Sequence, residues 1–316
     1  MLRSPEPLHI PDGFLTTWVS IAGWILAVII ITIALRQTRR QLGERQIPIM
    51  GVLAAFIFAA QAINFPVAAG TSGHLLGGTL AAITLGPWAA TLVMTAVISV
   101  QAILFQDGGL LALGWNILNM GVLTAFTGYL VYRSLSRITG GSGPVKAAAA
   151  FAAAWLSVEA GAIATAIELA VSGTSPLSFG LPAMVGVHAL IGLGEGLITS
   201  GAVTLLLAAR PEVLSAGERA PGRTSSAFVL IGLAAALVVA AFSPLAAAHP
   251  DGLEFVAARQ GFLDRAFDPL YSLLPDYAIP FIKNPAAATI AAVLLGTLLV
   301  FGLAWLMGRK VVQAEG

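Results

Sequence analysis

The sequence predicts an all-α, polytopic membrane protein, and three observations support this fold class. Of the 316 residues, 58% are hydrophobic and only 10% are charged, whereas about 25% of the residues of a soluble domain are charged. The mean hydropathy is +0.90. The apolar residues form continuous runs about as long as a bilayer is thick, unlike the alternating segments of an outer-membrane barrel. A water-soluble globular enzyme is therefore close to excluded.

The first span is expected at residues 14–35, and the charges that follow it give its orientation. Residues 1–13 do not read as a cleavable signal, because the apolar run after them is too long for a signal h-region. The span is followed by Arg36, Arg39, Arg40 and Arg45. By the positive-inside rule this loop is cytoplasmic and the N-terminus lies outside.

Further apolar runs follow along the chain. A second span at 47–64 leads into a polar, glycine-rich stretch at 64–78. A short apolar piece at 74–85 ends before Gly86 and Pro87. We expect the other spans at residues 88–105, 110–132, 145–171, 181–209, 227–247 and 286–307.

The distribution of basic residues decides whether the short piece crosses the membrane. If it crosses, twelve of the sixteen Lys and Arg residues lie inside, as the positive-inside rule favours. We therefore expect nine spans. About twelve helical residues reach only ~18 Å, which is less than the hydrocarbon core. Irregular backbone at that depth is tolerated where it lines a cavity or is packed within protein, so a site is expected near residues 64–86.

The chain divides into two parts joined by a linker. Residues 1–209 hold about seven spans, one of them short, and residues 210–226 form a polar, cytoplasmic linker. Residues 227–316 form a two-helix hairpin around an external segment at 249–284. The absence of cysteine excludes disulfides and thiolate ligands. The net charge of +1 gives no indication of nucleic acid binding.

Four histidines are candidate ligands: His9, His74, His188 and His249. Imidazoles without thiolates suit nickel, copper, zinc or cobalt. Three of these histidines also have a purely structural interpretation. His9 would be a solvated tail residue and His74 a helix cap. His188 would form a buried polar pair with Glu195, which lies on the same helix face.

Three glutamates lie inside expected spans, and common catalytic motifs are missing from the sequence. An ionisable residue inside a span is a functional candidate by default, which applies to Glu159, Glu168 and Glu195. No Walker A, H-E-x-x-H or G-x-S-x-G pattern occurs. We therefore expect a transporter without its own ATPase motif, driven by an ion gradient or by a partner, and not an enzyme.

Three separated motifs carry a resemblance to a known family. HIPDGFL (9–15), INFPVAAGTSGHLLGG (63–78) and HALIGLGEGLIT (188–199) together resemble the substrate-binding component of cobalt/nickel energy-coupling-factor transporters, over residues 8–209. HPDGLE (249–254) resembles the PDGLE extension, a small auxiliary subunit of these transporters. The resemblance thus implies a metal-binding membrane component at 1–209 fused to a PDGLE-type auxiliary hairpin at 227–316.

The resemblance implies a metal site built from nitrogen ligands. In this family the mature chain begins Met-His. The metal is held by the terminal amine, by the amide nitrogen and imidazole of the second residue, and by the histidine of the G-T-S-G-H-L loop. On this chain these groups correspond to Leu8, His9 and His74. Four nitrogens in a plane suit Ni(II) and, less strictly, Co(II). Residues expected to orient the ligands or balance charge are Asp12, Asn64, Thr71, Ser72 and His188.

The chain departs from the family pattern at its start, because seven residues precede Leu8. We hypothesise that translation begins at position 8, at a leucine-type codon that is read as methionine. Cleavage between Pro7 and Leu8 is an alternative that would also free an amine. If the extension is retained, the four-nitrogen site lacks its amine.

The resemblance implies the metal-capturing component of a high-affinity Ni²⁺/Co²⁺ uptake system, with nickel slightly favoured. The ion is the transported ligand and not a catalytic cofactor. The implied partners are membrane lipid, a transmembrane coupling protein and ATPase subunits, and no nucleic acid. The implied location is the bacterial cytoplasmic membrane, with the N-terminus outside and the C-terminus inside. The PDGLE segment would cap the outer mouth and help to load the metal.

An alternative function stays open beside this one. It is a stand-alone, proton-coupled secondary transporter of a divalent transition metal, with one of the three intramembrane glutamates as its proton relay. Independently of the choice, small residues on two spans predict faces for a partner's helix. These faces carry Gly51, Ala54, Ala55, Gly192 and Gly196.

Overall fold

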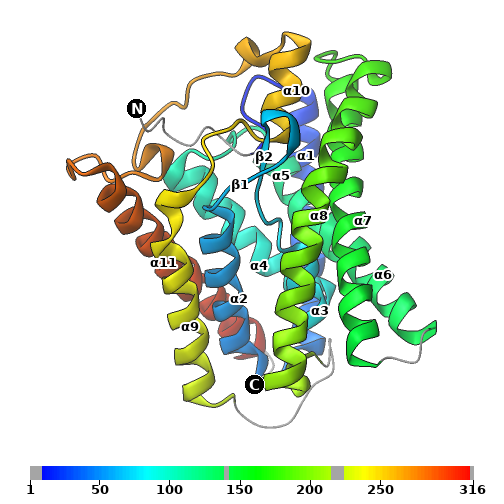
Figure 1. The fold of residues 1–316 in the computed structure, drawn as a ribbon, viewed down its shortest axis with the longest axis vertical. Helices are drawn as coiled ribbons and strands as arrows, with labels where there is room; N and C mark the ends of the chain where they lie inside the picture. Colours follow the sequence, from blue (N-terminus) through cyan, green and yellow to red (C-terminus); the bar gives the residue numbers. More distant parts are fainter. Residues whose placement is uncertain (1–8, 139–141, 215–223, 314–316) are drawn as a thin grey trace.

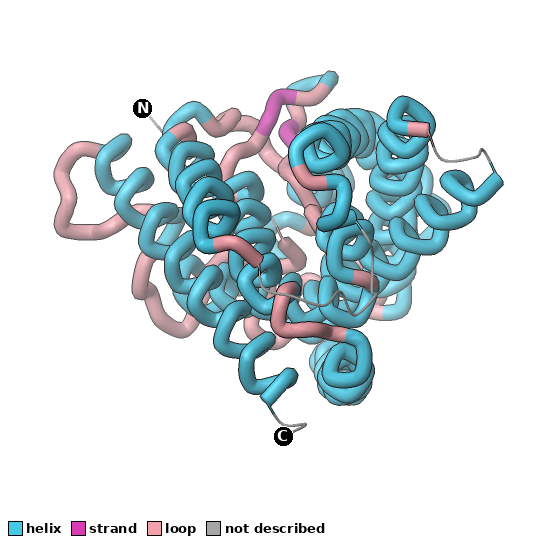
Figure 2. The backbone as a smooth tube through the Cα atoms, turned by 90° about the horizontal axis from the view of Figure 1, so that it is seen from below, coloured by secondary structure: helices cyan, strands magenta, loops and turns pink. Residues whose placement is uncertain are grey.

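The computed structural model describes residues 9–138, 142–214 and 224–313, and most of them lie in helices. The helices pack side by side as a bundle (Figures 1 and 2). Within the described residues, five helical stretches are long and apolar enough to cross a membrane. They are α1 (Thr17–Gln41), α4 with its π-helical end (Pro87–Phe105), α7 (Gly143–Val171), α8 (Leu177–Ala209) and α11 (Pro285–Gln313). The predicted all-α membrane fold is confirmed.

Shorter helices complete the bundle. The apolar helices α2 (Gln46–Gln61) and α9 (Ser226–Ala241) lie beside the long ones. The segment predicted at 110–132 forms α5 (Leu113–Asn116), the π-helix η3 (Ile117–Leu123) and α6 (Thr124–Ile138). The segment between α9 and α11 contains α10 (Gly252–Gln260). Short 3₁₀ turns occupy Ala68–Gly70, Pro211–Leu214, Ser243–Leu245, Leu263–Arg265 and Pro275–Tyr277.

The polar stretch between α2 and the short helix α3 is not helical at His74, contrary to one interpretation of the sequence. β1 (Phe65–Pro66) pairs antiparallel with β2 (Ser72–Gly73), and α3 spans only Gly78–Leu85. The residue before α3, Gly77, has a φ of +82°, in the left-handed region that glycine adopts at no steric cost. His74 therefore lies in the loop between β2 and α3, and the residue that caps α3 is Gly77.

Helix packing corrects the expectation for the small-residue faces. A side chain at Gly51 of α2 would come within 3.0 Å of the Phe301 carbonyl oxygen of α11. Side chains at Gly192 and Gly196 of α8 would come within 2.8 and 2.7 Å of Trp155 and Phe151 of α7. These faces are filled by helices of the same chain, so they do not await a partner's helix.

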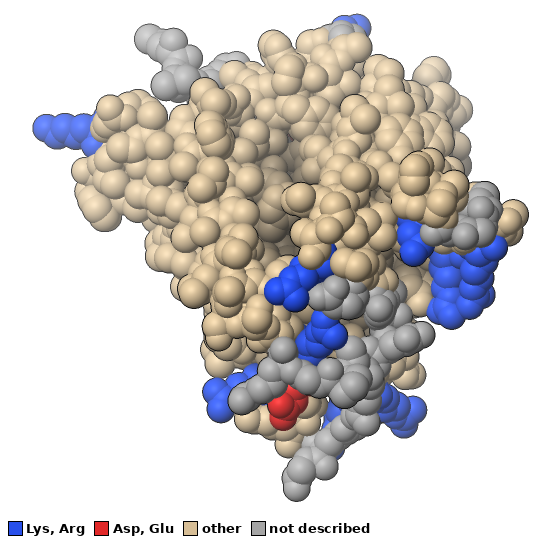
Figure 3. Space-filling view, turned by 60° about the horizontal axis from the view of Figure 1, so that its bottom comes forward, with Lys and Arg blue, Asp and Glu red and all other residues tan. Residues whose placement is uncertain are grey.

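Basic side chains collect at one end of the bundle, opposite to β1, β2 and α10 (Figures 1 and 3). The last turns of α1, α6 and α11 carry such residues. At the same end the Thr224 hydroxyl, just before α9, donates a hydrogen bond to the Arg45 carbonyl oxygen at 2.5 Å. The structure thus brings the basic loop after α1 and the start of the C-terminal hairpin together.

Candidate metal centre

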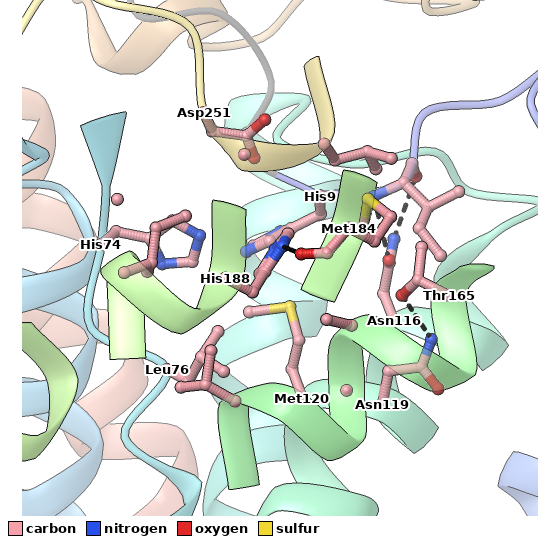
Figure 4. A pocket seen from close by; sticks show the side chains of 18 residues that line it. His9, His74, Leu76, Asn116, Asn119, Met120, Thr165, Met184, His188 and Asp251 are labelled. Carbon is pink, nitrogen blue, oxygen red and sulfur yellow. Dashed lines mark hydrogen bonds between the residues drawn. The ribbon is translucent and has the colours of Figure 1, made fainter. Parts of the chain in front are cut away.

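A cavity of about 70 Å³ lies at the end of the bundle that carries β2 and α10. Its wall includes three of the four histidines, which come from the N-terminal segment, the loop before α3, and α8 (Figure 4). The π-helix η3 contributes two further side chains. The polar and sulfur-bearing lining residues are His9, His74, His188, Asn116, Asn119, Thr165, Asp251, Met120 and Met184.

The N-terminal segment is held at the cavity by hydrogen bonds between side chains and backbone groups. The Asn116 amide oxygen accepts from the Ile10 amide at 3.1 Å, and its amide nitrogen donates to the Ile10 carbonyl at 3.1 Å. The Asp12 carboxylate accepts from the backbone amides of residues 110, 111 and 112 at 3.0, 2.8 and 3.1 Å. Since neither Asn116 nor Asp12 is hydrogen-bonded to an imidazole, they position His9 through the backbone.

His9 is buried, with 3% of its surface exposed. Its Nδ1 donates to the Asp107 carbonyl oxygen at 3.1 Å and lies 3.4 Å from the Asp107 carboxylate oxygen Oδ1. Its Nε2 is buried and has no hydrogen-bond partner. A buried polar atom without a partner is costly, so this nitrogen fits a ligand that the protein binds.

His74 is fixed by the loop in which it lies. Its Nδ1 donates to the Leu75 carbonyl oxygen at 2.9 Å. The fully buried Glu195 of α8 accepts from the backbone amides of Leu76 and Gly77 at 2.6 and 3.0 Å. Burial, and then the neighbouring His9, lower the pKa of the His74 imidazole from 6.5 to about 4. The ring is therefore neutral at neutral pH, which is the form that binds a metal ion.

The rings of His9 and His74 meet edge to face, with centroids 5.6 Å apart and planes at 71°. In the third ring, that of His188 on α8, Nδ1 donates to the Met184 carbonyl oxygen at 2.8 Å (Figure 4). In all three rings Nδ1 is thus directed to a carbonyl group, which fixes the ring orientation. His249, the fourth histidine, is exposed and outside the cavity.

The other residues expected near the metal hold the loop instead of an imidazole ring. The Thr71 hydroxyl donates to the Ala68 carbonyl at 2.9 Å, and the Ser72 hydroxyl donates to the His249 carbonyl at 2.7 Å. The Asn64 carbonyl accepts from the Ala247 amide at 2.8 Å. Two of these three contacts tie the loop to the C-terminal part of the chain. Leu8, expected to supply the amine, lies outside the described residues.

Sequence reasoning did not single out Asp107 or Asn116. Both come from the region that follows α4, which read only as a turn and the start of an apolar run. The one available signal was a carboxylate beside two glycines in a chain with few charges. Glu195 was considered as a proton relay or as a partner of His188, whereas its carboxylate holds the loop after His74.

The described residues contain no group of three or more His, Asp or Glu side chains placed to hold a metal ion. Of the three imidazoles that line the cavity, those of His9 and His74 meet, and they would offer part of a coordination sphere that backbone or terminal nitrogens would have to complete. The bundle of apolar helices is that of a multi-pass membrane protein, and the histidine-lined cavity at one end of it is the candidate site for a small cationic ligand.

Family comparisons identify the class of transporter. Residues 9–213 match the family described as the cobalt uptake substrate-specific transmembrane region, and residues 226–313 match the PDGLE domain. The chain belongs to this cobalt uptake family and carries a PDGLE domain after it. It is a transmembrane protein of cobalt and nickel transport, and a transporter rather than an enzyme.

Individual relatives agree with this assignment. The putative fused nickel transport protein NikMN of Archaeoglobus fulgidus is 39% identical over 96% of this chain and 98% of its own length. The fused nickel transport protein NikMN of Rhodobacter capsulatus is 30% identical over 93% of this chain and 95% of its own. A crystal structure described as a truncated transition metal transporter is 33% identical in sequence, with a TM-score of 0.57. The match covers 63% of this chain and 98% of the chain in that structure.

Proposed function

We propose that this protein captures Ni²⁺ or Co²⁺ outside the cytoplasmic membrane and delivers the ion inward. The observation that carries the proposal is the pair of buried imidazoles, His9 and His74, whose rings lie 5.6 Å apart at a cavity. The unpartnered Nε2 of His9 supports a bound cation as the missing partner. The ion is cargo in this proposal, so its binding must be reversible.

The metal would be held by nitrogen ligands. His9 and His74 supply imidazoles, the His9 amide supplies a further nitrogen, and the amine of residue 8 completes the set if the mature chain begins there. Such a four-nitrogen plane favours Ni(II) over Co(II). The cavity of about 70 Å³ has room for roughly half a dozen waters at about 10–15 Å³ each, so it can hold an ion together with some of its coordinated waters.

The two parts of the chain would have different tasks. Residues 1–209 bind the metal, 210–226 form a cytoplasmic linker, and 227–316 form the auxiliary hairpin. The first turn of α10 supports this division, because Asp251, Gly252 and Leu253 line the cavity and so cover its outer side. In this arrangement the auxiliary part limits escape of a bound ion.

Energy for transport would come from partner proteins. We infer a transmembrane coupling protein and ATPase subunits, since the chain shows no Walker A pattern. The basic end of the bundle (Figure 3) would face the cytoplasm by the positive-inside rule. The cavity then opens outward in the inner membrane of a bacterium, with residues before α1 outside and the end of α11 inside.

One observation favours the alternative, a proton-coupled secondary transporter that works alone. Both carboxylate oxygens of Glu159 in α7 are buried without a hydrogen-bond partner, as in a site that exchanges protons. Metal uptake by cells that lack the ATPase subunits separates the two functions. Uptake that persists there and collapses with an uncoupler would support the secondary transporter and overturn the ATP-driven one.

Elemental analysis tests the capture site directly. Protein is purified from cells given equimolar nickel and cobalt, and its N-terminus is determined by intact mass. We expect one metal equivalent in the wild type, none in His74→Ala, and an unchanged content in His249→Ala, which alters an exposed histidine outside the cavity. Metal retained in His74→Ala, or an empty wild type that begins at residue 8, would overturn the proposal.

A further inference from the structure

One carboxylate joins the C-terminal auxiliary part to the candidate ligand His9. Tyr277, in the segment between α10 and α11, donates from its hydroxyl to the Asp107 oxygen Oδ2 at 2.5 Å. The other oxygen of the same carboxylate, Oδ1, lies 3.4 Å from His9 Nδ1. All three side chains are buried, each with 3% of its surface exposed. The structure therefore contains a continuous path Tyr277–Asp107–His9.

The surroundings of Tyr277 hold its hydroxyl at this position. Its ring stacks on Phe105 with centroids 4.7 Å apart and planes at 12°. The Leu274 amide donates to the Leu104 carbonyl oxygen at 3.0 Å. Asp276 and Tyr277 both have a φ of +53°, a strained conformation for residues other than glycine. The backbone keeps this strained conformation at the residue whose hydroxyl bonds to the Asp107 carboxylate.

The chemistry of the contact suits a fixed donor. Burial and the adjacent Asp107 raise the pKa of the Tyr277 hydroxyl well above its ordinary value, so Tyr277 remains a neutral donor at all physiological pH values. With one oxygen engaged by Tyr277, the carboxylate presents the other to His9. The ring orientation is set by the Asp107 carbonyl oxygen, whereas the nearby carboxylate raises the basicity of a metal-binding imidazole and balances part of the charge of a bound divalent cation.

We propose that Tyr277 is a positioning residue through which the auxiliary hairpin strengthens metal binding at His9, by orienting Asp107. This inference rests on the proposed function, because it assumes that His9 binds the metal. It assigns to the hairpin a defined action on the site in addition to covering the cavity. Loss of the Tyr277 hydroxyl removes the hydrogen bond to Oδ2 that helps to set the direction of the carboxylate, so Oδ1 is held less firmly beside the imidazole.

Tyr271 provides a matched control in the same segment. Its hydroxyl donates to the Ile103 carbonyl oxygen at 2.8 Å, so it joins the same two regions of the chain. It has no contact with Asp107 among the hydrogen bonds described, and 36% of its surface is exposed. Tyr271→Phe and Tyr277→Phe thus remove the same chemical group, and only the second lies on the path to His9.

The test measures the affinity of the protein for Ni²⁺ and Co²⁺ in detergent. It uses the chain that begins at residue 1 or the chain that begins at residue 8, whichever binds metal in the wild type. We expect Tyr277→Phe to weaken binding about 10- to 100-fold, as for other residues that support a ligand, and Tyr271→Phe to change it less than about twofold. Asp107→Asn keeps an acceptor for Tyr277 but removes the charge beside His9. In that background Tyr277→Phe should add less than about twofold, since the two residues act on one path.

The outcomes separate the two proposals. A wild type that binds neither metal would overturn the proposed function and this inference with it. A wild type that binds metal, with Tyr277→Phe binding equally well or with both tyrosine variants equally weakened, would overturn the path alone. If Tyr277→Phe does not fold, Asp107→Asn decides: unchanged affinity and an unchanged visible spectrum of the bound Ni²⁺ would refute a role for the carboxylate.

Discussion

The exchange Glu195→Gln tests how the loop after His74 is held. The carboxylate is fully buried and accepts from the Leu76 and Gly77 amides at 2.6 and 3.0 Å. A glutamine accepts with one oxygen only, and its NH₂ group then faces a buried backbone N–H. The lost charged hydrogen bond and the unsatisfied donor cost about 3 kcal/mol together. If this cost falls on the ordering of the loop, metal affinity decreases on the order of a hundredfold.

The assay compares Ni²⁺ affinity and thermal unfolding of Glu195→Gln with those of Glu168→Gln. Glu168 is also buried, at 5% exposure, but it accepts from the Asn119 amide nitrogen at 2.9 Å, and a glutamine oxygen preserves this bond. We expect the control to bind within about threefold of the wild type. Equal affinity and equal unfolding temperature of the two variants would refute the reasoning that the Glu195 carboxylate holds the loop.

Three further predictions concern pH, orientation and packing. His74 lies outside the membrane-spanning helices, and its pKa is lowered from 6.5 to about 4 by burial and by His9. Its contribution to the stability of the metal-free chain is full above pH 6.5 and is lost as the pH falls toward 4. His74→Gln should therefore make the unfolding temperature depend less on pH over this range. An unchanged pH dependence in this variant would contradict the lowered pKa of His74. Because the chain has no cysteine, Lys283→Cys should react with an impermeant maleimide in intact cells and Lys310→Cys only after permeabilisation, and the reverse result would invert the orientation. Gly114→Ala should lower the unfolding temperature, because its Cβ meets the backbone of α1, whereas Gly302→Ala, with open space around it, should leave it unchanged or higher; equal effects would refute this packing argument.

Much of the fold follows from local sequence features. A run of apolar residues must be helical in a bilayer, because the backbone has no other partner for its hydrogen bonds there. This reasoning predicted the long helices, the short α3 and the basic end of the bundle. It did not predict which faces meet, since lipid and protein interior are equally apolar and a small-residue stripe fits either a partner or the chain itself. Gly51 and Gly192 illustrate this, because each packs against a helix of its own chain.

The candidate site was predictable only in part. His9 and His74 stood out as imidazoles in distinctive motifs within an apolar chain, and the structure places them at one cavity. The residues that support them are ordinary polar side chains from distant positions. Nothing in the neighbourhood of Asp107 or Tyr277 indicates that they share a hydrogen bond, because that contact depends on how the segment between α10 and α11 folds back toward the residues that follow α4.

The sequence by itself determined that this chain is a helical membrane protein, which end is basic, and which motifs it shares with a cobalt uptake family. These properties are read residue by residue from hydropathy, charge and spacing. Only the tertiary structure decided that His9, His74 and His188 line one cavity, that Glu195 holds the loop after His74, and that Tyr277 of the PDGLE domain contacts Asp107, which lies beside His9. The physical reason is that a buried polar group takes its partner from whichever element packs beside it, and that neighbour is set by the packing of the whole bundle.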